Sequence, residues 1–515
     1  MQMARRERRQ TPPLQKYTAW GFETNYPFKA AKNIPATQIG ARGLLDLPDE
    51  LLLWVVSELR ATRLDQPQSL AFRNKHKESD RQDENFYRKY ALYGLCLTSK
   101  RLNRLAIPAL YDAVLGSTTN YGLGRLRLIW RTLTEKEELR YHVRYVENLL
   151  EDCLGNRLSA DLEDLEDLVG AQLVTEYFSK LAWIVRMCPN IAQMSVISIE
   201  SNNFTFWNHV LDPLDDGQEE KGGGDLSGAP KHILCKLKKL TLQTNVSRVY
   251  RNEPSVEFDH IYSEILKFSP LVELRACGVA AMDDVEVFNP GISSIPLGTT
   301  IESLQRIEIT QCSLPLESVD KMLSACNSLR HFFCHWVHLR CEMSHRQVNL
   351  LPNLQRHRKS LQTLCLMGNL ATFGSTTESW VSFPSLCQMT ALKEAKLCNL
   401  FLPDSECRKR SLSDNPTVPI APELAPALED LTISYNMYYL RPETWGSSVL
   451  ARLQRLAADC TQYLPRLRDL TVQYEGGEIS PWAGDDEDLV RRFGEKGIHL
   501  SIVKDVDVLA MIGQE

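Results

Sequence analysis

The sequence predicts an α/β protein in which a short all-α module of three helices precedes an irregular solenoid with a parallel β-sheet on its concave side. Two observations lead to this expectation. A short apolar frame recurs nine times from residue 191 onward, and an unusually apolar helix is encoded near the N-terminus. At 515 residues the chain is long for one compact core, so its length alone favours several domains or a repeat architecture.

The composition is that of an ordinary soluble protein, with 43% apolar and 24% charged residues. A net charge of −6 gives no general attraction to nucleic acid or to an anionic membrane. No apolar run approaches the roughly 18 residues that a membrane-spanning helix needs. We therefore expect an intracellular protein, cytoplasmic and/or nuclear, with no membrane or nucleic-acid partner. The 14 cysteines are scattered without disulfide-framework spacing, so reduced and mostly buried thiols are expected.

The first 42 residues form a basic segment that contains the cluster RRERR (5–9). One interpretation is a nuclear import signal. The other is a solvated, disordered arm. We expect residues 1–42 to be a disordered basic arm and leave both interpretations of the cluster open.

Residues 44–59, LLDLPDELLLWVVSEL, predict the apolar helix. Pro48 suits the first turn of a helix, and the acidic Asp49 and Glu50 suit its positive end. Six apolar residues follow without a break, and a helix that is apolar all round is buried on several sides. The flanking segments are too polar to bury it, because a polar insertion is expected at about 62–89. Residues 90–115 then predict two more short helices, the second capped by Ser99 and ended by Pro108.

The recurring frame is L-x-x-L-x-(apolar), which is typical of a short strand with one buried face. In four of the nine copies the residue eight places after the first is Asn or Cys, namely Asn245, Cys312, Asn369 and Asn436. This is the signature of leucine-rich repeats, in which that side chain can bond the turn leaving the strand. VRYVENL from Val143 is a weaker earlier copy, and GIHLSIV (497–503) is a plausible last strand. The nine copies begin at Ile191, Leu237, Leu271, Leu304, Leu329, Leu361, Leu392, Leu428 and Leu467.

Each strand needs its neighbours to bury its apolar face, so the units should stack into a solenoid with a parallel sheet. Helix-like stretches lie between the strands, for example at 260–270 and 317–326. We assign the solenoid to residues 116–505 and a tail to 506–515, and we expect the acidic, Gly-rich loop at 211–231 to be disordered. The copies are spaced more widely than usual repeats, and the excess falls in loops.

Positions three and five of each copy should face the concave surface. Glu273 beside Arg306, and Arg275 beside Glu308, predict a ladder of alternating charge between adjacent strands. Such pairs can simply screen one another, at under about 1 kcal/mol per exposed pair, or they can bind a partner. His331 and Phe333 are favoured as anchors because an exposed aromatic residue at the centre of such a face often carries binding energy. The expected substrate-binding residues are Arg275, Arg306, Glu308, His331, Phe333 and Lys396.

The segment FFCHWVHLRCEMSH (332–345) brings together Cys334, His335, His338, Cys341 and His345. All are possible zinc ligands, but their spacing matches no usual structural site, and the repeat register points Cys334 inward and His335 outward. We therefore expect no metal site and no cofactor. Walker, G-x-S-x-G, H-E-x-x-H and C-x-x-C motifs are missing, and NYGLGRL (120–126) lacks the context of a nucleotide loop. No catalytic residues are expected.

LPDELL (47–52) and LCLTSKRLNRLAIPALY (95–111) resemble the two halves of an F-box, the second half especially as it occurs in filamentous fungi. Residues 43–115 would be this F-box, with an insertion that is unusually long for the family. The resemblance implies a non-enzymatic adaptor whose helices bind the Skp-type linker protein of a cullin–RING ubiquitin ligase, while the repeats bind a protein substrate. By position, the linker-binding residues would be Leu47, Pro48, Leu51, Leu52, Val55, Val56, Leu95, Cys96, Leu97, Leu102 and Leu105.

Other hypotheses stay open at this point. The helices could merely cap the solenoid, which terminal repeats require, and the chain could be an interaction scaffold with no role in ubiquitin ligation. A metal or thiol enzyme centred on 334–345 would contain zinc. Nucleic-acid binding through the RRERR cluster would depend steeply on salt.

Overall fold

The computed structural model describes most of the chain between residues 44 and 504. The described ranges are 44–63, 75–117, 120–149, 168–197, 200–211, 234–243, 261–262, 265, 270–279, 301–341, 347–349, 351–373, 380–402, 419–436, 442–475 and 486–504. The expected basic arm (1–42) and the tail (506–515) lie outside these residues, as does the acidic loop (211–231) apart from Leu211.

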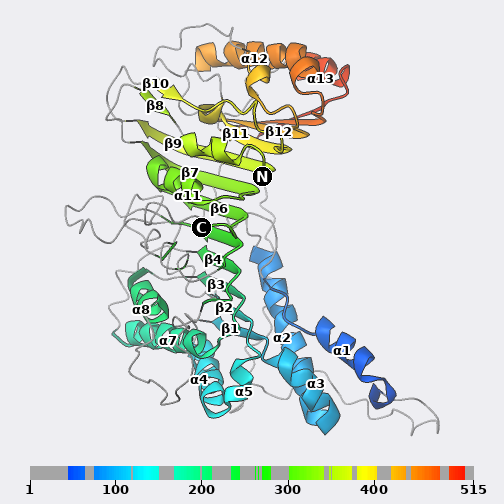
Figure 1. Ribbon diagram of the computed structural model, residues 1–515, viewed down its shortest axis with the longest axis vertical. Coiled ribbons are helices and arrows are strands. Elements are labelled where there is room, and N and C mark those ends of the chain that lie inside the picture. Colours follow the sequence, from blue (N-terminus) through cyan, green and yellow to red (C-terminus); the bar gives the residue numbers. More distant parts are fainter. Residues whose placement is uncertain are drawn as a thin grey trace, which may run out of the picture.

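The protein is α/β and is organised around one parallel sheet of twelve strands. The strands follow one another in chain order and stack into an elongated column (Figure 1). A separate parallel pair joins β8 (Gln347–Asn349) to β10 (Trp380–Ser382). The strands of the large sheet are β1 (Ala113–Ser117), β2 (Tyr145–Leu149), β3 (Gln193–Ile197), β4 (Lys239–Gln243), β5 (Glu273–Cys277), β6 (Arg306–Cys312), β7 (His331–Cys341), β9 (Thr363–Phe373), β11 (Glu394–Cys398), β12 (Asp430–Asn436), β13 (Asp469–Glu475) and β14 (His499–Lys504).

The repeat frame predicted the strands and their register correctly. All nine copies form strands, and the third residue of each copy pairs with the third residue of the next, from Gln193 opposite Lys239 to Asp430 opposite Asp469. The early copy at Val143 forms β2, and 497–503 contributes β14. The apolar positions of the frame are buried in one continuous core that extends from Val114 to Leu500.

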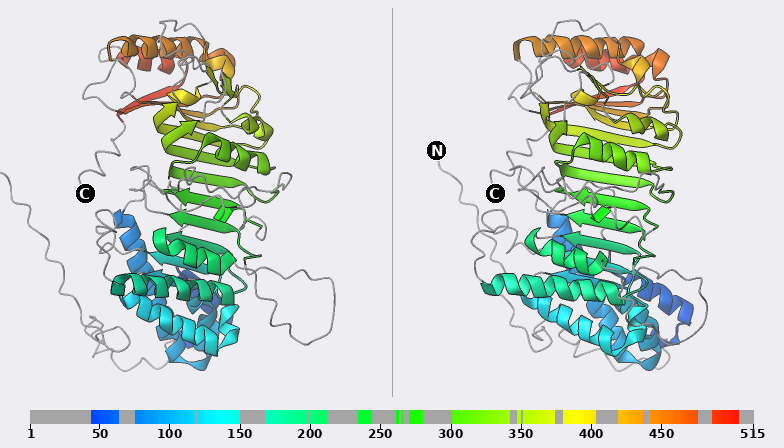
Figure 2. Two further views of the ribbon diagram at one scale, coloured as in Figure 1. Left: turned by 90° about the vertical axis from the view of Figure 1, so that its left-hand side faces the viewer. Right: turned by 60° about the vertical axis from the view of Figure 1, so that its left-hand side comes forward.

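Helices connect the strands and cover one side of the sheet, where α4, α7, α8 and α11 lie (Figure 1). The helices α12 and α13 lie at the C-terminal end of the column (Figure 2). The α-helices are α1 (Asp49–Glu58), α2 (Lys75–Thr98), α3 (Lys100–Leu110), α4 (Asn120–Glu135), α5 (Glu137–Arg140), α7 (Leu168–Met187), α8 (Glu200–Leu211), α11 (Leu316–Ala325), α12 (Pro442–Tyr463) and α13 (Asp486–Gly494). Short 3₁₀ turns are η1 (Leu44–Asp46), η5 (Pro352–His357), η6 (Asn399–Phe401) and η7 (Ala421–Glu423).

Three boundaries near the N-terminus differ from the prediction. Much of the expected polar insertion at 62–89 is helical, because α2 begins at Lys75 and continues without a break to Thr98. Pro108 does not end α3, which includes it and continues to Leu110. The helical module also ends before residue 115, because Ala113 begins β1. The polar residues of α2 misled the prediction because several of them face the sheet rather than solvent.

NYGLGRL (120–126) lies in α4, which agrees with its rejection as a nucleotide loop. Within the described part of the chain, no helix combines the length and the apolar character that are needed to cross a bilayer.

Candidate functional site

The first three helices form a small bundle in which α1 and α2 both pack on α3. Its core is the cluster of Val56, Leu92, Ala106 and Ala109, with Leu59, Leu95, Cys96 and Leu110 packed against it. These residues come from all three helices, so none of the three can bury its apolar side without the others. Leu52 and Leu102 are also buried, at 1% exposure each.

Arg101 on α3 holds the N-terminal end of α1 in place. Its guanidinium donates to Asp49 Oδ1 at 2.7 Å and to the carbonyl oxygens of Leu45 and Leu47 at 2.6 and 2.8 Å. Arg104 reaches the other oxygen of Asp49 at 2.9 Å. Since Asp49 stands in the first turn of α1, its carboxylate also interacts favourably with the helix dipole. Ser99 caps α3 as predicted, accepting a hydrogen bond from the amide of Leu102 at 3.2 Å.

The bundle also presents large apolar side chains to solvent. Leu51 is 48% exposed, Leu53 47%, Trp54 65% and Leu97 69%. About half or more of each of these side chains is therefore left uncovered by the described part of the chain. We refer to these four exposed residues together with the exposed Pro48 as the docking face.

The residues assigned to linker binding therefore fall into three groups. Leu52, Val56 and Leu102 belong to the bundle core. Leu47, Val55, Leu95, Cys96 and Leu105 are half-buried. Pro48, Leu51 and Leu97 are exposed. Leu53 and Trp54 were not assigned to linker binding. The unbroken apolar run that contains them was the sequence feature that could have identified them. The exposed Tyr87, Tyr90 and Tyr93 of α2 were also missed, because the segment around them was assigned to the insertion or to a buried helix.

The sheet has a second face, opposite the apolar core, that carries positions three and five of the frame. We call it the polar face. Its first half is not the open surface that was expected. Arg275 and Glu308 are only 7% and 1% exposed, so neither side chain is as accessible as was expected, and their role in substrate binding stays a prediction. Ser195 and Thr241 on neighbouring strands are likewise buried.

The predicted charge ladder is present in the strand register, with Glu273 opposite Arg306 and Arg275 opposite Glu308. Arg275 Nε lies 3.7 Å from Glu308 Oε2, and Arg306 Nη2 lies 3.1 Å from the same oxygen. Arg275 also lies 3.7 Å from Glu273. One buried carboxylate thus faces two guanidinium groups, so this part of the face is neutralised internally.

The favoured anchors lie at the next strand and are partly covered. Arg306 lies over the ring of Phe333, 4.7 Å from its centroid, which is a cation–π contact. His331 Nδ1 lies 3.2 Å from Thr363 Oγ1. Burial lowers the pKa of His331, with further lowering from the positive charges of Arg306 and Arg330. Both His331 and Phe333 are half-buried, as is Lys396 farther along the sheet.

The accessible part of the polar face lies toward the C-terminal strands. Glu394, Asp430 and Asp469 occupy position three on β11, β12 and β13, are in register, and are exposed. The pKa of Asp430 is raised by partial desolvation of its carboxylate among the neighbouring strands and by the negative charge of Asp469 beside it. His499 on β14 lies 3.5 Å from Asp469.

Two side chains of the rejected zinc motif, those of Cys334 and His335, belong to the described part of the chain. Cys334 is buried, with its Sγ 3.9 Å from Cys312 Sγ, while the adjacent His335 is half-exposed. Burial and the neighbouring Cys312 raise the pKa of Cys334. Within the described ranges, no group of three or more His, Cys, Asp or Glu side chains could hold a metal ion. The side chains of His338, Cys341 and His345 lie outside the described part of the chain.

No protein-family model matches the chain, and no curated protein matches it in sequence.

Proposed function

We propose that this protein is a substrate-recognition adaptor of a Skp–cullin–F-box type ubiquitin ligase. In this proposal the helices α1–α3 are an F-box that binds the Skp-type linker protein, and the leucine-rich repeats of the sheet bind a protein substrate. The adaptor's contribution is proximity, because it holds the substrate beside the catalytic partner of the ligase. The proposal requires no cofactor and no bond chemistry from the chain itself.

The observation that carries the proposal is the exposure of Leu51, Trp54 and Leu97 on a bundle that already has its own core. A purely structural cap would direct its large apolar side chains toward the solenoid. Exposed apolar patches of this kind mark interaction surfaces more often than they occur without a partner. Trp is one of the residue types that most often carry binding energy, and Leu51 and Trp54 have the i, i+3 spacing with which a helix presents anchors to a groove.

The test measures the affinity of the purified chain for a Skp-type linker protein. We expect the unmodified chain to bind the linker protein and Leu51→Asp to bind it about 30-fold more weakly or worse. Truncating an anchor that is buried in the complex costs about 2–4 kcal/mol, and burying a charge there costs more. Pro48→Ala should weaken binding by a smaller factor. Leu128→Asp is the matched control, since Leu128 is 43% exposed on α4, away from the docking face.

Circular dichroism and thermal melting should show that each variant is folded. If the unmodified chain does not bind the linker protein, the adaptor proposal fails, and the chain is better described as an interaction scaffold capped by three helices. If Leu128→Asp weakens binding as much as Leu51→Asp, the docking face is wrongly placed.

A further inference from the structure

The N-terminal half of α2 makes a charged contact with the sheet that the sequence did not suggest. Both nitrogens of the Arg81 guanidinium fork face the carboxylate of Glu147 on β2, one pairing with Oε1 and the other lying 3.1 Å from Oε2. Tyr145 on the same strand donates its hydroxyl to Glu147 Oε2 at 2.7 Å. The side chains of Arg81 and Glu147 are 10% and 1% exposed, so this is a buried ion pair.

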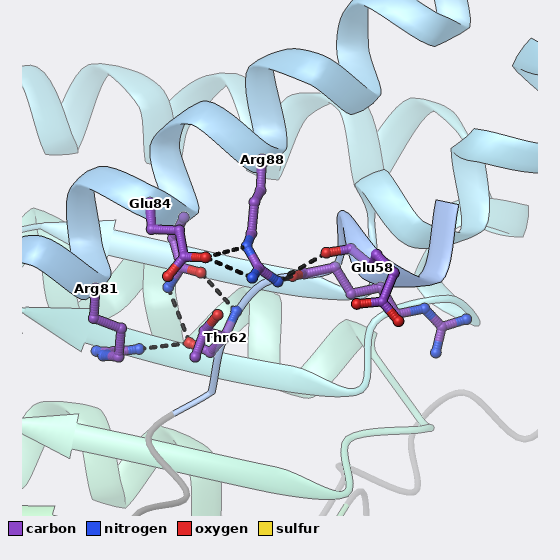
Figure 3. A network of polar contacts seen from close by, with 7 residues as sticks. Glu58, Thr62, Arg81, Glu84 and Arg88 are labelled. Atoms are coloured by element: carbon purple, nitrogen blue, oxygen red, sulfur yellow. Dashed lines mark hydrogen bonds and ion pairs between the residues drawn. The ribbon is translucent and has the colours of Figure 1, made fainter. Parts of the chain in front are cut away.

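The same arginine also ties down the segment that leaves α1 (Figure 3). Arg81 Nη1 donates to the carbonyl oxygen of Thr62 at 2.8 Å. The side chain of Asn85 accepts from the Thr62 amide at 2.6 Å and donates to the Thr62 carbonyl at 3.0 Å. Arg88 donates to the carbonyl oxygens of Glu58 and Arg60, both at 2.9 Å.

A second pair connects this segment directly to the start of the sheet. Arg63 donates to Asp112, just before β1, at 2.8 Å, and its guanidinium lies over the ring of Tyr145 at 5.5 Å from the centroid. Asp112 is buried. We call Thr62, Arg63, Arg81, Asn85, Asp112, Tyr145 and Glu147 together the latch.

The latch lies where one helix serves two parts of the molecule. The C-terminal half of α2 packs in the three-helix bundle through Leu92, whereas Arg81 and Asn85 in its N-terminal half contact β2 and the segment after α1. Figure 1 shows α2 beside the first strands of the sheet, on the side away from α7 and α8. Because α2 is one unbroken helix of 24 residues, it transmits the orientation of the sheet to the bundle.

A buried bidentate ion pair is suited to this role, since its geometry is satisfied in one relative placement of its two elements. Any rotation of α2 on the sheet would leave a buried carboxylate and a buried guanidinium unpaired, which is costly. An exposed ion pair carries no such penalty when it separates, because water solvates both charges. Arg127 on α4 and Glu176 on α7 form one, with 52% and 34% exposure.

We propose that the latch is a positioning device that holds the docking face in one fixed orientation relative to the sheet. The docking face and the sheet then move as one body, although the bundle has its own core. If the proposed function holds, this orientation also fixes where a substrate on the sheet lies relative to the linker protein. The fixed orientation itself does not depend on the proposed function.

The test measures the distance between the bundle and the sheet in the full chain. Bioorthogonal labels are placed at Glu50 on α1 and Lys321 on α11, both of which are exposed, and the distance distribution is recorded by double electron–electron resonance. The latch variant combines Arg81→Met with Glu147→Gln, so that no charge is left buried and unpaired. The matched control combines Arg127→Met with Glu176→Gln, which removes the same chemistry from an exposed helix pair.

We expect one narrow distribution for the unmodified chain and for the control, and a distribution at least about twofold wider for the latch variant. Arg63→Met, which removes one pair at a partly exposed position, should give a smaller widening and serves as the second variant if the first does not fold. The proposal is overturned if the folded latch variants stay as narrow as the unmodified chain, or if the unmodified chain is already broad.

Linker binding separates this proposal from the proposed function. The latch variant keeps every residue of the docking face, so its affinity for the linker protein should stay within about twofold of the unmodified chain. A chain that fails to bind the linker protein refutes the adaptor proposal and leaves the distance result standing. If the latch variant binds the linker protein tenfold more weakly than the unmodified chain, the latch contributes to linker binding itself. That result would overturn the proposal that the latch only positions the docking face.

Discussion

Gly116 on β1 lies directly against the hydroxyl of Tyr177 on α7. A Cβ atom at position 116 would stand 2.2 Å from Tyr177 Oη and 3.3 Å from its Cζ, which no side chain tolerates without movement. Tyr177 is 1% exposed, and its hydroxyl has no hydrogen-bond partner among the described residues. The glycine is therefore required by space, at the point where the first helix layer meets the first strand.

Gly116→Ala should lower the free energy of unfolding by about 1–3 kcal/mol, as overpacking in a close-packed core does. Tyr177→Phe removes the clashing oxygen, so the double variant should recover at least about 1 kcal/mol of the loss. Urea denaturation of the four proteins measures this coupling. Strictly additive effects would contradict the proposed clash.

Arg101→Met should loosen the start of α1, because this side chain bonds one oxygen of Asp49 and both carbonyl groups of the preceding turn, and Arg104 replaces none of the carbonyl contacts. We expect a loss of about 1–2 kcal/mol, since hydrogen bonds to charged groups contribute more than neutral ones but this site is partly exposed. Arg101→Lys should recover only part of it, because an ammonium lacks the planar fork. Hydrogen exchange at the amides of residues 52–55, the first that can hydrogen-bond within α1, reports the effect, and unchanged protection in Arg101→Met would contradict it.

Lys89 on α2 is half-buried and places its ammonium group near β1, 3.4 Å from the carbonyl oxygen of Ala113. Burial, with a smaller contribution from the positive charge of Arg125, lowers its pKa to about 8 from an ordinary value of 10.5. Below pH 8 the lysine is protonated in both folded and unfolded chains, and the cost of burying its charge is fully present. Between about 8 and 10.5 the unfolded chain binds more protons, so this lysine makes stability rise with pH.

Lys89→Met should therefore stabilise the protein at pH 7 by roughly 1–3 kcal/mol. It should also remove the increase in stability that this lysine causes as the pH rises above 8. Thermal melts from pH 7 to 10.5 compare it with Lys100→Met, in which an exposed lysine of α3 is replaced. A Lys89→Met protein that melts lower than the unmodified chain at pH 7 would show that the ammonium is stabilising.

Glu308 should matter far more for stability than Glu273, although the two look equivalent in the ladder. Glu308→Ala leaves Arg275 and Arg306 without the buried carboxylate that faces both, and should cost about 3–5 kcal/mol. Glu273 is partly exposed, so Glu273→Ala should cost at most about 1 kcal/mol. Equal shifts in the denaturation midpoints would contradict the different burial of the two carboxylates.

The strands were predictable because the repeat frame is a local pattern. Alternation of buried and outward residues over six positions determines which face of each strand is apolar, and the same frame repeated along the chain determines the register. Leu428 and Leu431, for example, could be assigned to the core from spacing alone. The capping role of Ser99 was also predictable, because a cap depends on residues three apart in sequence.

Accessibility and the position of α2 were not predictable in this way. The frame placed Arg275 and Glu308 on the polar face correctly, but it could not show that they would be buried, because burial depends on everything else that packs there. Arg81 and Asn85 looked like solvated residues of a polar insertion, since nothing local indicates a partner such as Glu147, which is 66 residues away from Arg81 in the chain.

By itself, then, the sequence determined the α/β class, the order and register of the repeat strands, and the apolar character of α1, because each depends on short-range spacing. Tertiary structure alone decided which apolar residues of the bundle stay exposed, which charges of the polar face are buried, and how α2 is held on the sheet. These properties depend on contacts between segments far apart in the chain, and a pattern of neighbouring residues does not encode which distant segment will supply the partner.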